Sequence, residues 1–208
     1  HVEYTPARRG SYLPEKTRDG RPVRPGNLPE IMPGPEDTYQ SYGYGWANAS
    51  NTPYRMFKQF DHEGGIRTPM IAHWPKGVSR KGTIIQSVSH LIDIMPTVLE
   101  VTGIESPGII DGTPAIARDG HSLAAAFRGE ELAGHQTLFF QHARGRALRH
   151  GKWKLVSMIS KKKWELYDLE VDPLELHDLA TEEPGRVKQL AAMWRAESAR
   201  HAGQAALN

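Results

Sequence analysis

The second half of the chain carries a pattern that restricts its fold to a small antiparallel sheet covered by a helix. Four short segments alternate apolar and polar residues with the period of two that is typical of strands. They are Thr137–Gln141, Arg146–Arg149, Lys152–Val156 and Trp164–Asp168. Turns at His150-Gly151 and around Lys161 predict a meander, with Trp153 and Leu155 pointing inward.

A helical stripe follows these strands. Its apolar residues recur at helical spacing over about residues 184 to 201, and they are Val187, Leu190, Met193 and Trp194. This stripe is expected to cover one face of the sheet, because two such layers bury each other's apolar surface.

Upstream, the pattern predicts two buried strands, Met70–Trp74 after Pro69 and Thr83–Val88. A helix is expected over His90–Thr102, with Ser89 as its cap and Gly103 as its stop. Its apolar face would carry Leu91, Met95 and Val98. Because Pro96 fits poorly inside a helix, the alternative is a start near Met95.

A short helix is expected over Ser122–Arg128, ended by Gly129, and residues 104 to 119 read as loop. Residues 1 to 41 differ from the rest, since seven of the 15 prolines fall there with little periodicity. Such a segment cannot bury enough apolar surface to fold alone. We interpret it as an ordered, irregular arm that lies on a larger body.

Composition excludes several classes of protein. The formal net charge is +2, so no strong field favours nucleic acid. The longest apolar runs fall far short of the about 20 residues of a membrane helix. There is no cysteine, hence no disulfide framework, and the histidines lack zinc spacing. The start, HVEYTPARRG, has no signal peptide and suggests a piece of a longer chain.

The most informative stretch for function runs from Tyr42 to Pro75. Lys58 lies six residues before the pair Gly64-Gly65. We interpret this as a lysine on an irregular loop, followed by a glycine turn that uses positive φ. A lysine there suits contact with an anion, although a solvated surface lysine is the alternative.

This stretch resembles the sulfatase family, the arylsulfatase type in particular. The string EGGIRTPMIAHWP matches the family's E-G-G-x-R-x-P-x-x-x-x-x-P, and GWANASNTP matches its G-W-A-x-A-x-N-T-P. Further on, RALRHGKWKLV and ELYDLEVDPLELHDLA also resemble family motifs. The resemblance covers roughly residues 42 to 201.

The resemblance implies an α/β fold, with α+β organisation in this fragment. The expected architecture is the C-terminal end of an alkaline phosphatase-like mixed sheet, then a four-stranded antiparallel sheet with a packed C-terminal helix. The implied domains are a proline-rich arm (1–41), the C-terminal part of the catalytic domain (42–130) and a small subdomain (131–208).

The resemblance also implies roles for individual residues. Lys58 would contact the sulfate group of a sulfate ester and act in catalysis. His142, in a run that resembles a cleft-facing run of the family, would bind substrate; the alternative is a loop histidine satisfied by backbone. His62 is expected to bind substrate because it neighbours Lys58, and its alternative is a packing histidine. Gly64, Gly65 and Arg67 would be structural, with Arg67 in an ion pair that fixes the glycine turn.

The catalytic group of the family is a formylglycine made from Cys or Ser in C/S-x-P-x-R, and this motif is absent from the chain. The paired acids that hold the family's divalent cation, usually calcium, are also not recognisable. We therefore expect no metal ligand in this chain. The expectation is a sulfatase fragment, inactive alone, whose nucleophile and cation lie in a missing N-terminal part.

Two rival interpretations stay open. One is a phosphonate monoester or phosphodiester hydrolase of the same superfamily, and the other is a non-catalytic anion-binding module. The expected partner is a sulfate-ester small molecule or a sulfated carbohydrate, with neither nucleic acid nor membrane. Because an unpaired apolar strand exposes its edges, the fragment is also expected to form homo-oligomers. The resemblance suggests a bacterial periplasmic or secreted protein.

Overall fold

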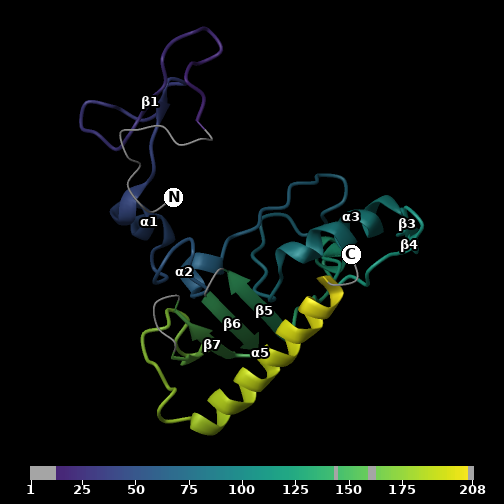
Figure 1. Cartoon of the computed structure of the whole chain (residues 1–208). Coiled ribbons are helices and arrows are strands. Elements are labelled where there is room, and N and C mark those ends of the chain that lie inside the picture. Colours follow the sequence, from purple (N-terminus) through teal and green to yellow (C-terminus); the bar gives the residue numbers. More distant parts are fainter. Residues whose placement is uncertain (1–12, 143–144, 159–162, 206–208) are drawn as a thin grey trace. The chain divides into compact units, whose positions relative to one another are not determined.

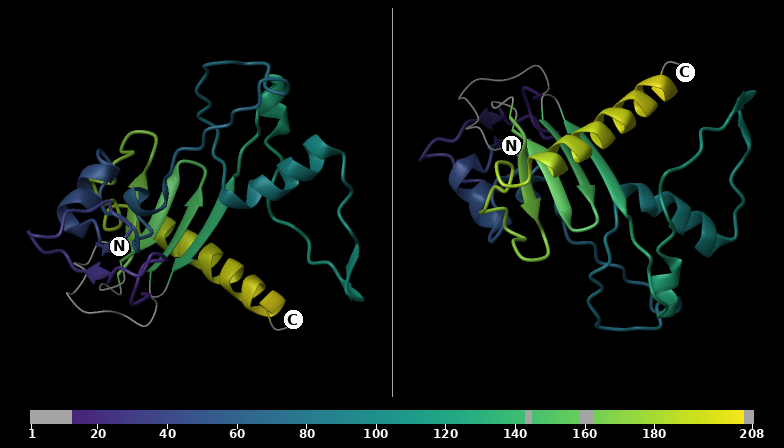
Figure 2. Two further views of the ribbon diagram at one scale, coloured as in Figure 1. Left: turned by 90° about the horizontal axis from the view of Figure 1, so that it is seen from above. Right: turned by 90° about the horizontal axis from the view of Figure 1, so that it is seen from below.

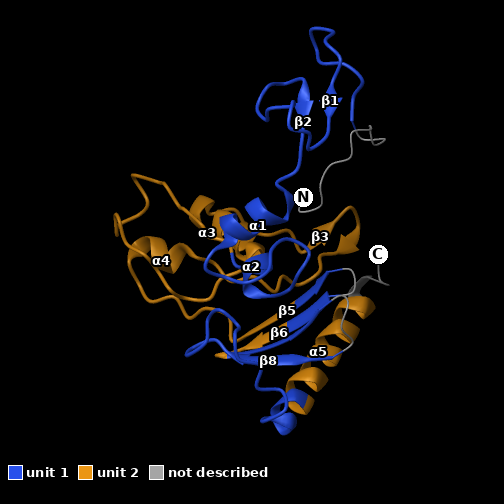
Figure 3. Ribbon diagram, turned by 90° about the vertical axis from the view of Figure 1, so that its left-hand side faces the viewer, with its two compact units in different colours: residues 1–67, 140–147, 153–187 blue, residues 68–139, 148–152, 188–208 orange. Residues whose placement is uncertain are grey.

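The computed structural model describes residues 13–142, 145–158 and 163–205, and Figure 1 shows the course of the chain. The turn expected around Lys161 lies outside these residues. The chain divides into two compact units, each built from three separate segments (Figure 3). The first comprises His1–Arg67, Phe140–Ala147 and Trp153–Val187; the second comprises Thr68–Phe139, Leu148–Lys152 and Lys188–Asn208.

The four predicted strands are present and form one sheet in chain order. They are β5 (Thr137–His142), β6 (Gly145–His150), β7 (Trp153–Ser157) and β8 (Glu165–Asp168). Strands β7 and β8 run antiparallel, with Trp153 opposite Asp168 and Val156 opposite Glu165. Ala147, Val156 and Tyr167 form a buried apolar cluster between strands. The alternating pattern therefore predicted this sheet correctly.

The predicted C-terminal helix is also confirmed. Helix α5 spans Pro184–Ala205 (Figure 2). Trp194 stacks on Phe139 of β5 with ring centroids 5.5 Å apart. The guanidinium of Arg186 lies 4.1 Å from the ring centroid of Trp153 in β7. Leu190 is buried on the same stripe, as the helical spacing predicted.

The helix expected near residue 90 begins later than its apolar pattern. A 3-10 turn, η1 (Leu91–Asp93), precedes α3 (Ile94–Thr102), so Pro96 lies in the first turn of the helix. The cap is His90 and not Ser89, because the His90 side chain accepts the amide of Ile92 and Asp93 accepts that of His90. Gly103 ends the helix in the left-handed conformation, as expected.

Two further elements complete the second unit. Helix α4 (Ala124–Arg128) ends at Gly129 as predicted. Strands β3 (Ile109–Ile110) and β4 (Thr113–Pro114) form a hairpin where a plain loop was expected. Asp111 and Gly112 form its turn with positive φ at both positions, the signature of a two-residue hairpin.

The two buried strands expected before residue 89 are wrong. Residues 70–74 and 83–88 are not in strands, and Ile71 and Ile84 are 90% and 86% exposed. A strand needs a neighbour for its backbone N–H and C=O groups. Within the described residues, neither segment has such a neighbour. The apolar face expected to pack after these segments is exposed as well, at Leu91 in η1 and at Met95 and Val98 in α3.

The first unit begins with an irregular segment that holds two short parallel strands, β1 (Arg24–Pro25) and β2 (Thr38–Tyr39). Two helices follow, α1 (Gly43–Asn51) and α2 (Glu63–Ile66). The sequence pattern predicted no helix for the residues of α1. No described helix combines the length and the apolarity that crossing a bilayer requires.

Candidate functional site

Lys58 lies in a closed loop between α1 and α2. The loop is closed at its base by a hydrogen bond of 3.0 Å from the amide of Gly64 to the carbonyl of Arg55. Inside it, Phe57 and Phe60 pack edge to face with ring centroids 5.3 Å apart. The Lys58 side chain is exposed, and it has no hydrogen bond or ion pair with any described residue. We call residues 55–64 the lysine loop.

The lysine loop contains two non-glycine residues with positive φ. They are Met56, at 66°, and Gln59, at 87°, and they flank Phe57 and Lys58. Such backbone conformations cost about 1–3 kcal/mol each and persist only where the surroundings impose them. The surroundings of the loop therefore hold the backbone on both sides of Phe57 and Lys58 in this conformation.

The glycine pair works by close approach and not by positive φ, which corrects the expectation from the sequence. Gly64 and Gly65 lie in α2 without positive φ. A Cβ on Gly64 would lie 2.3 Å from the carbonyl oxygens of Arg55 and Met56. A Cβ on Gly65 would lie 2.0 Å from that of Phe60. The two glycines thus let α2 contact the backbone of the lysine loop.

A buried ion cluster holds the C-terminal end of the loop. The ammonium of Lys154, on β7, lies 2.8 Å from Glu63 Oε1 and 3.4 Å from Glu175 Oε1. Glu175 Oε2 accepts the backbone amide of Glu63 at 2.8 Å. Lys154 and Glu175 are both 0% exposed. Because a buried charge is costly unless paired, these contacts depend on each other.

A second buried network links both ends of the loop to β8. Arg55 donates hydrogen bonds to the hydroxyl of Tyr167 at 3.0 Å and to the carbonyl of Glu175 at 2.5 Å. The Tyr167 hydroxyl donates to Glu165 Oε2 at 2.7 Å, and the same oxygen lies 2.9 Å from His62 Nε2. The hydrogen bond from His62 lowers the pKa of Glu165 to about 2. Burial raises the pKa of Tyr167 above its ordinary range.

His62 is therefore part of the support of the loop. Its side chain is 0% exposed, so no ring atom is accessible to a ligand in this structure. His62 therefore has no exposed surface in this structure with which to make the predicted substrate contact. Its Nδ1 is buried and has no hydrogen-bond partner among the described residues.

His142, the other predicted substrate contact, is exposed at the end of β5. The charge of His142 acts on Asp61, which is buried within the lysine loop. Burial raises the pKa of Asp61, and the charges of Lys154, His142 and His62 oppose that rise. Gly145 leaves room for this carboxylate, because a Cβ there would lie 2.6 Å from Asp61 Oδ2.

Arg67 lies just beyond the loop on the exposed side of α2. Its Nη1 is 3.8 Å from Glu63 Oε2, and its guanidinium lies 4.7 Å from the ring centroid of Tyr54. Arg67 thus adds a partly exposed cation to an acid that Lys154 already pairs. Sequence reasoning missed Lys154, Glu165 and Glu175, and the signal available was a lysine inside the strand pattern WKLV.

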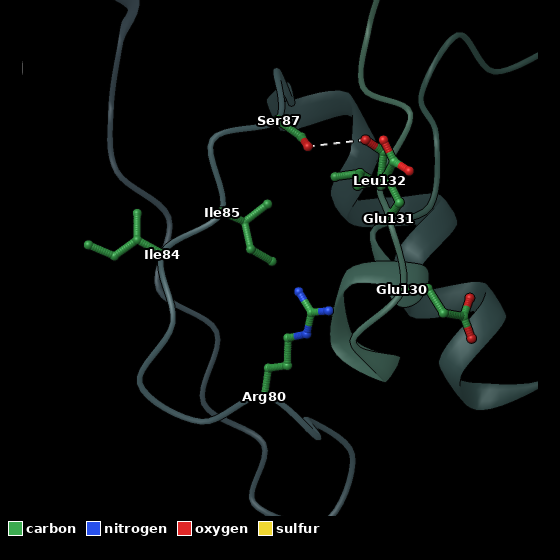
Figure 4. A pocket seen from close by; sticks show the side chains of 7 residues that line it. All are labelled: Arg80, Ile84, Ile85, Ser87, Glu130, Glu131 and Leu132. Atoms are coloured by element: carbon green, nitrogen blue, oxygen red, sulfur yellow. Dashed lines mark hydrogen bonds between the residues drawn. The ribbon is translucent and has the colours of Figure 1, made fainter.

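No metal-binding group of three or more His, Cys, Asp or Glu side chains occurs within the part of the chain that the structure describes. A hollow of about 260 Å³ lies in the second unit, between residues 80–87 and 130–132 (Figure 4). Ser87 at its wall donates a hydrogen bond of 3.1 Å to the carbonyl of Leu132. The hollow contains none of the predicted site residues, so the lysine loop remains the candidate site.

Comparison with known proteins gives consistent results. The family model described as N-sulphoglucosamine sulphohydrolase, C-terminal, matches residues 54–199. An uncharacterized sulfatase of Schizosaccharomyces pombe is 33% identical over 169 residues, which cover 74% of this chain and 28% of that protein. The arylsulfatase of Klebsiella aerogenes is 36% identical over 93 residues, 44% of this chain and 20% of the enzyme.

Among solved structures, Ps i-CgsB in complex with k-i-k-neocarrahexaose is similar with a TM-score of 0.58 and 23% identity. The match covers 71% of this chain and 32% of that one. The chain thus spans less than a third of the length of these relatives.

Proposed function

Because the chain belongs to the sulfatase family described as N-sulphoglucosamine sulphohydrolase, C-terminal, we propose that it supplies one wall of a sulfate-ester hydrolase site. The matched part confirms the resemblance read from the sequence, and the similar solved structures confirm the fold class. In this proposal Lys58 contacts the sulfate group of the substrate. Its supporting observation is an exposed ammonium without a hydrogen-bond or ion-pair partner among the described residues, in a loop whose two ends both contact Glu175.

The chemistry of that contact is electrostatic. A sulfate ester carries negative charge on its non-bridging oxygens, and an ammonium placed there stabilises charge that develops as the S–O bond breaks. Lysine can also donate a proton to the leaving oxygen. Both roles need Lys58 at a fixed position, since stabilisation falls when a charged group must first be ordered.

The nucleophile and the cation belong to other residues. Sulfatases as a class depend on a divalent cation, and we propose calcium bound outside this chain. The described residues do not fit a metal, because they offer no group of suitable ligands. The chain also contains no C/S-x-P-x-R sequence.

For the substrate we propose a sulfated small molecule or a sulfated carbohydrate. This rests on relatives whose names state such activity, and on the solved relative that holds a neocarrahexaose. His142 is the exposed side chain next to the lysine loop that could contact such a substrate. Export to the periplasm or secretion is part of the same proposal, and the absence of cysteine fits either.

The test is Lys58→Ala in an enzyme that contains this chain together with the nucleophile and the cation. We expect kcat/KM for an aryl sulfate to fall by about 10²–10³-fold, the scale for losing one oxyanion-type partner. Lys188→Ala, at an exposed lysine of α5, is the matched control.

Near-normal turnover by Lys58→Ala would contradict the proposal. Faster hydrolysis of an aryl phosphonate than of the sulfate would favour the superfamily rival, and anion binding without any turnover would favour a binding module.

A further inference from the structure

One buried glutamate contacts both ends of the lysine loop. The carbonyl of Glu175 accepts a hydrogen bond from Arg55, at the start of the loop. Its carboxylate accepts the amide of Glu63, at the end of the loop. Glu175 itself has a φ of 57°, an unusual conformation for a glutamate. A strained, buried residue that contacts both ends of one loop indicates a role in holding that loop.

Lys154 completes this arrangement from the sheet. It lies within ion-pair distance of Glu63 and Glu175, and it is fully buried on β7, between the apolar Trp153 and Leu155. Taking an ammonium out of water costs several kcal/mol unless its partners compensate. A methionine would fill this volume without that cost. Lys154 therefore fixes the position of the Glu63 carboxylate, although an apolar side chain would pack at this position at a lower desolvation cost.

We propose that Glu175 and Lys154 are positioning residues that set the location of Lys58 for anion binding. The inference rests on the proposed function of Lys58. Neither residue contacts substrate in this proposal, and both act through the two ends of the lysine loop. They fix the span between Arg55 and Glu63, and so they impose the positive φ of Met56 and Gln59.

The experiment is a titration of the ¹⁵N-labelled 208-residue chain with inorganic sulfate, followed by amide chemical shifts of the lysine loop. The variants are Lys58→Ala, Glu175→Gln and Glu175→Ala, with Glu182→Gln as the control at an exposed glutamate of the same segment. Amide hydrogen exchange is measured on each protein, for Gly64 and for strands β7 and β8.

We expect sulfate to shift the loop amides of the unmodified chain and of Glu182→Gln, and Lys58→Ala to abolish the shifts. Glu175→Ala should weaken the apparent affinity roughly tenfold, about 1.4 kcal/mol. Glu175→Gln should lose less, because its amide oxygen still accepts the amide of Glu63. In Glu175→Ala the exchange of the Gly64 amide should speed up while β7 and β8 stay protected.

The outcomes separate the two proposals. If sulfate shifts no loop amide that depends on Lys58, the proposed function fails, and the exchange of Gly64 still tests the role of Glu175. If Glu175→Ala binds sulfate as tightly as the unmodified chain and keeps Gly64 protected, the positioning role is refuted. In the remaining outcome, Glu175→Ala loses exchange protection throughout β7 and β8 while its folded molecules bind sulfate with unchanged affinity. That result would show a purely structural role for Glu175 and would also refute the positioning role.

Discussion

The substitution Gly65→Ala distinguishes two explanations of the glycine pair, because they predict opposite changes in the free energy of unfolding. If Gly65 served only as a flexible turn, alanine would be neutral or would stabilise the short helix by up to about 1 kcal/mol. The structure predicts the opposite. The new Cβ would lie 2.0 Å from the carbonyl oxygen of Phe60, whereas ordinary contact begins at 3.4 Å, so the backbone must move by about 3.4 − 2.0 = 1.4 Å.

The clashing atom is the backbone carbonyl oxygen of Phe60, which cannot avoid the new Cβ by a rotamer change. Overpacking of this kind costs about 1–3 kcal/mol. The displaced segment, residues 57–60, contains Lys58. We therefore expect a net loss of about 1–2 kcal/mol of unfolding free energy in urea, together with faster exchange of the lysine-loop amides.

Gly185→Ala is the matched control, because it lies near the start of α5 with no atom within 4 Å of the added Cβ. It should be neutral or slightly stabilising. Unfolding curves that show Gly65→Ala to be as stable as the unmodified chain, with an unchanged lysine loop, would refute the close-approach argument.

Two other predictions concern buried polar groups. Glu165 has a pKa lowered from 4.5 to about 2, so its contribution of up to about 3 kcal/mol is present above pH 4.5 and is lost as the pH falls through 2. Glu165→Gln should flatten the acid side of the stability curve followed by circular dichroism, and an unchanged slope would contradict this. Thr97→Val should lower unfolding free energy by about 1–3 kcal/mol, because the buried Thr97 hydroxyl accepts the amide of Leu123 at 2.8 Å. Thr102→Val, at an exposed position of the same helix, should have little effect in thermal unfolding, and equal losses for the two variants would exclude the hydrogen bond as the cause.

The sheet and its helix could be predicted because their partners are close in the sequence. Strands β5 to β8 and helix α5 lie within about seventy residues, and their apolar periodicity reports contacts that this chain itself makes. The segments 70–74 and 83–88 have equally apolar sequences, yet they are not strands here. An apolar pattern shows that a segment needs a packing partner. It does not show that this chain contains the strand or helix that packs there.

The exposed lysine of the candidate site could be named from the sequence, whereas the buried residues that hold its loop could not. Lys58 was found from its spacing to the glycines, whereas Lys154 was read as the outward residue of an alternating strand. Both faces of β7 are in fact covered, one by α5 and the other by the carboxylates of Glu63 and Glu175. A period of two cannot distinguish a polar face in water from a polar face that is buried and paired.

Three of the contacts that hold the lysine loop join residues more than one hundred positions apart. They link Arg55 to Tyr167, His62 to Glu165 and Glu63 to Glu175. During synthesis on a ribosome, the loop leaves the exit tunnel long before β8 and the segment after it exist. Its strained backbone lacks those contacts until β8 and the segment through Glu175 have been translated and folded. A stop codon anywhere before residue 165 would therefore yield a chain in which Lys58 is present but its loop lacks the contacts that hold it.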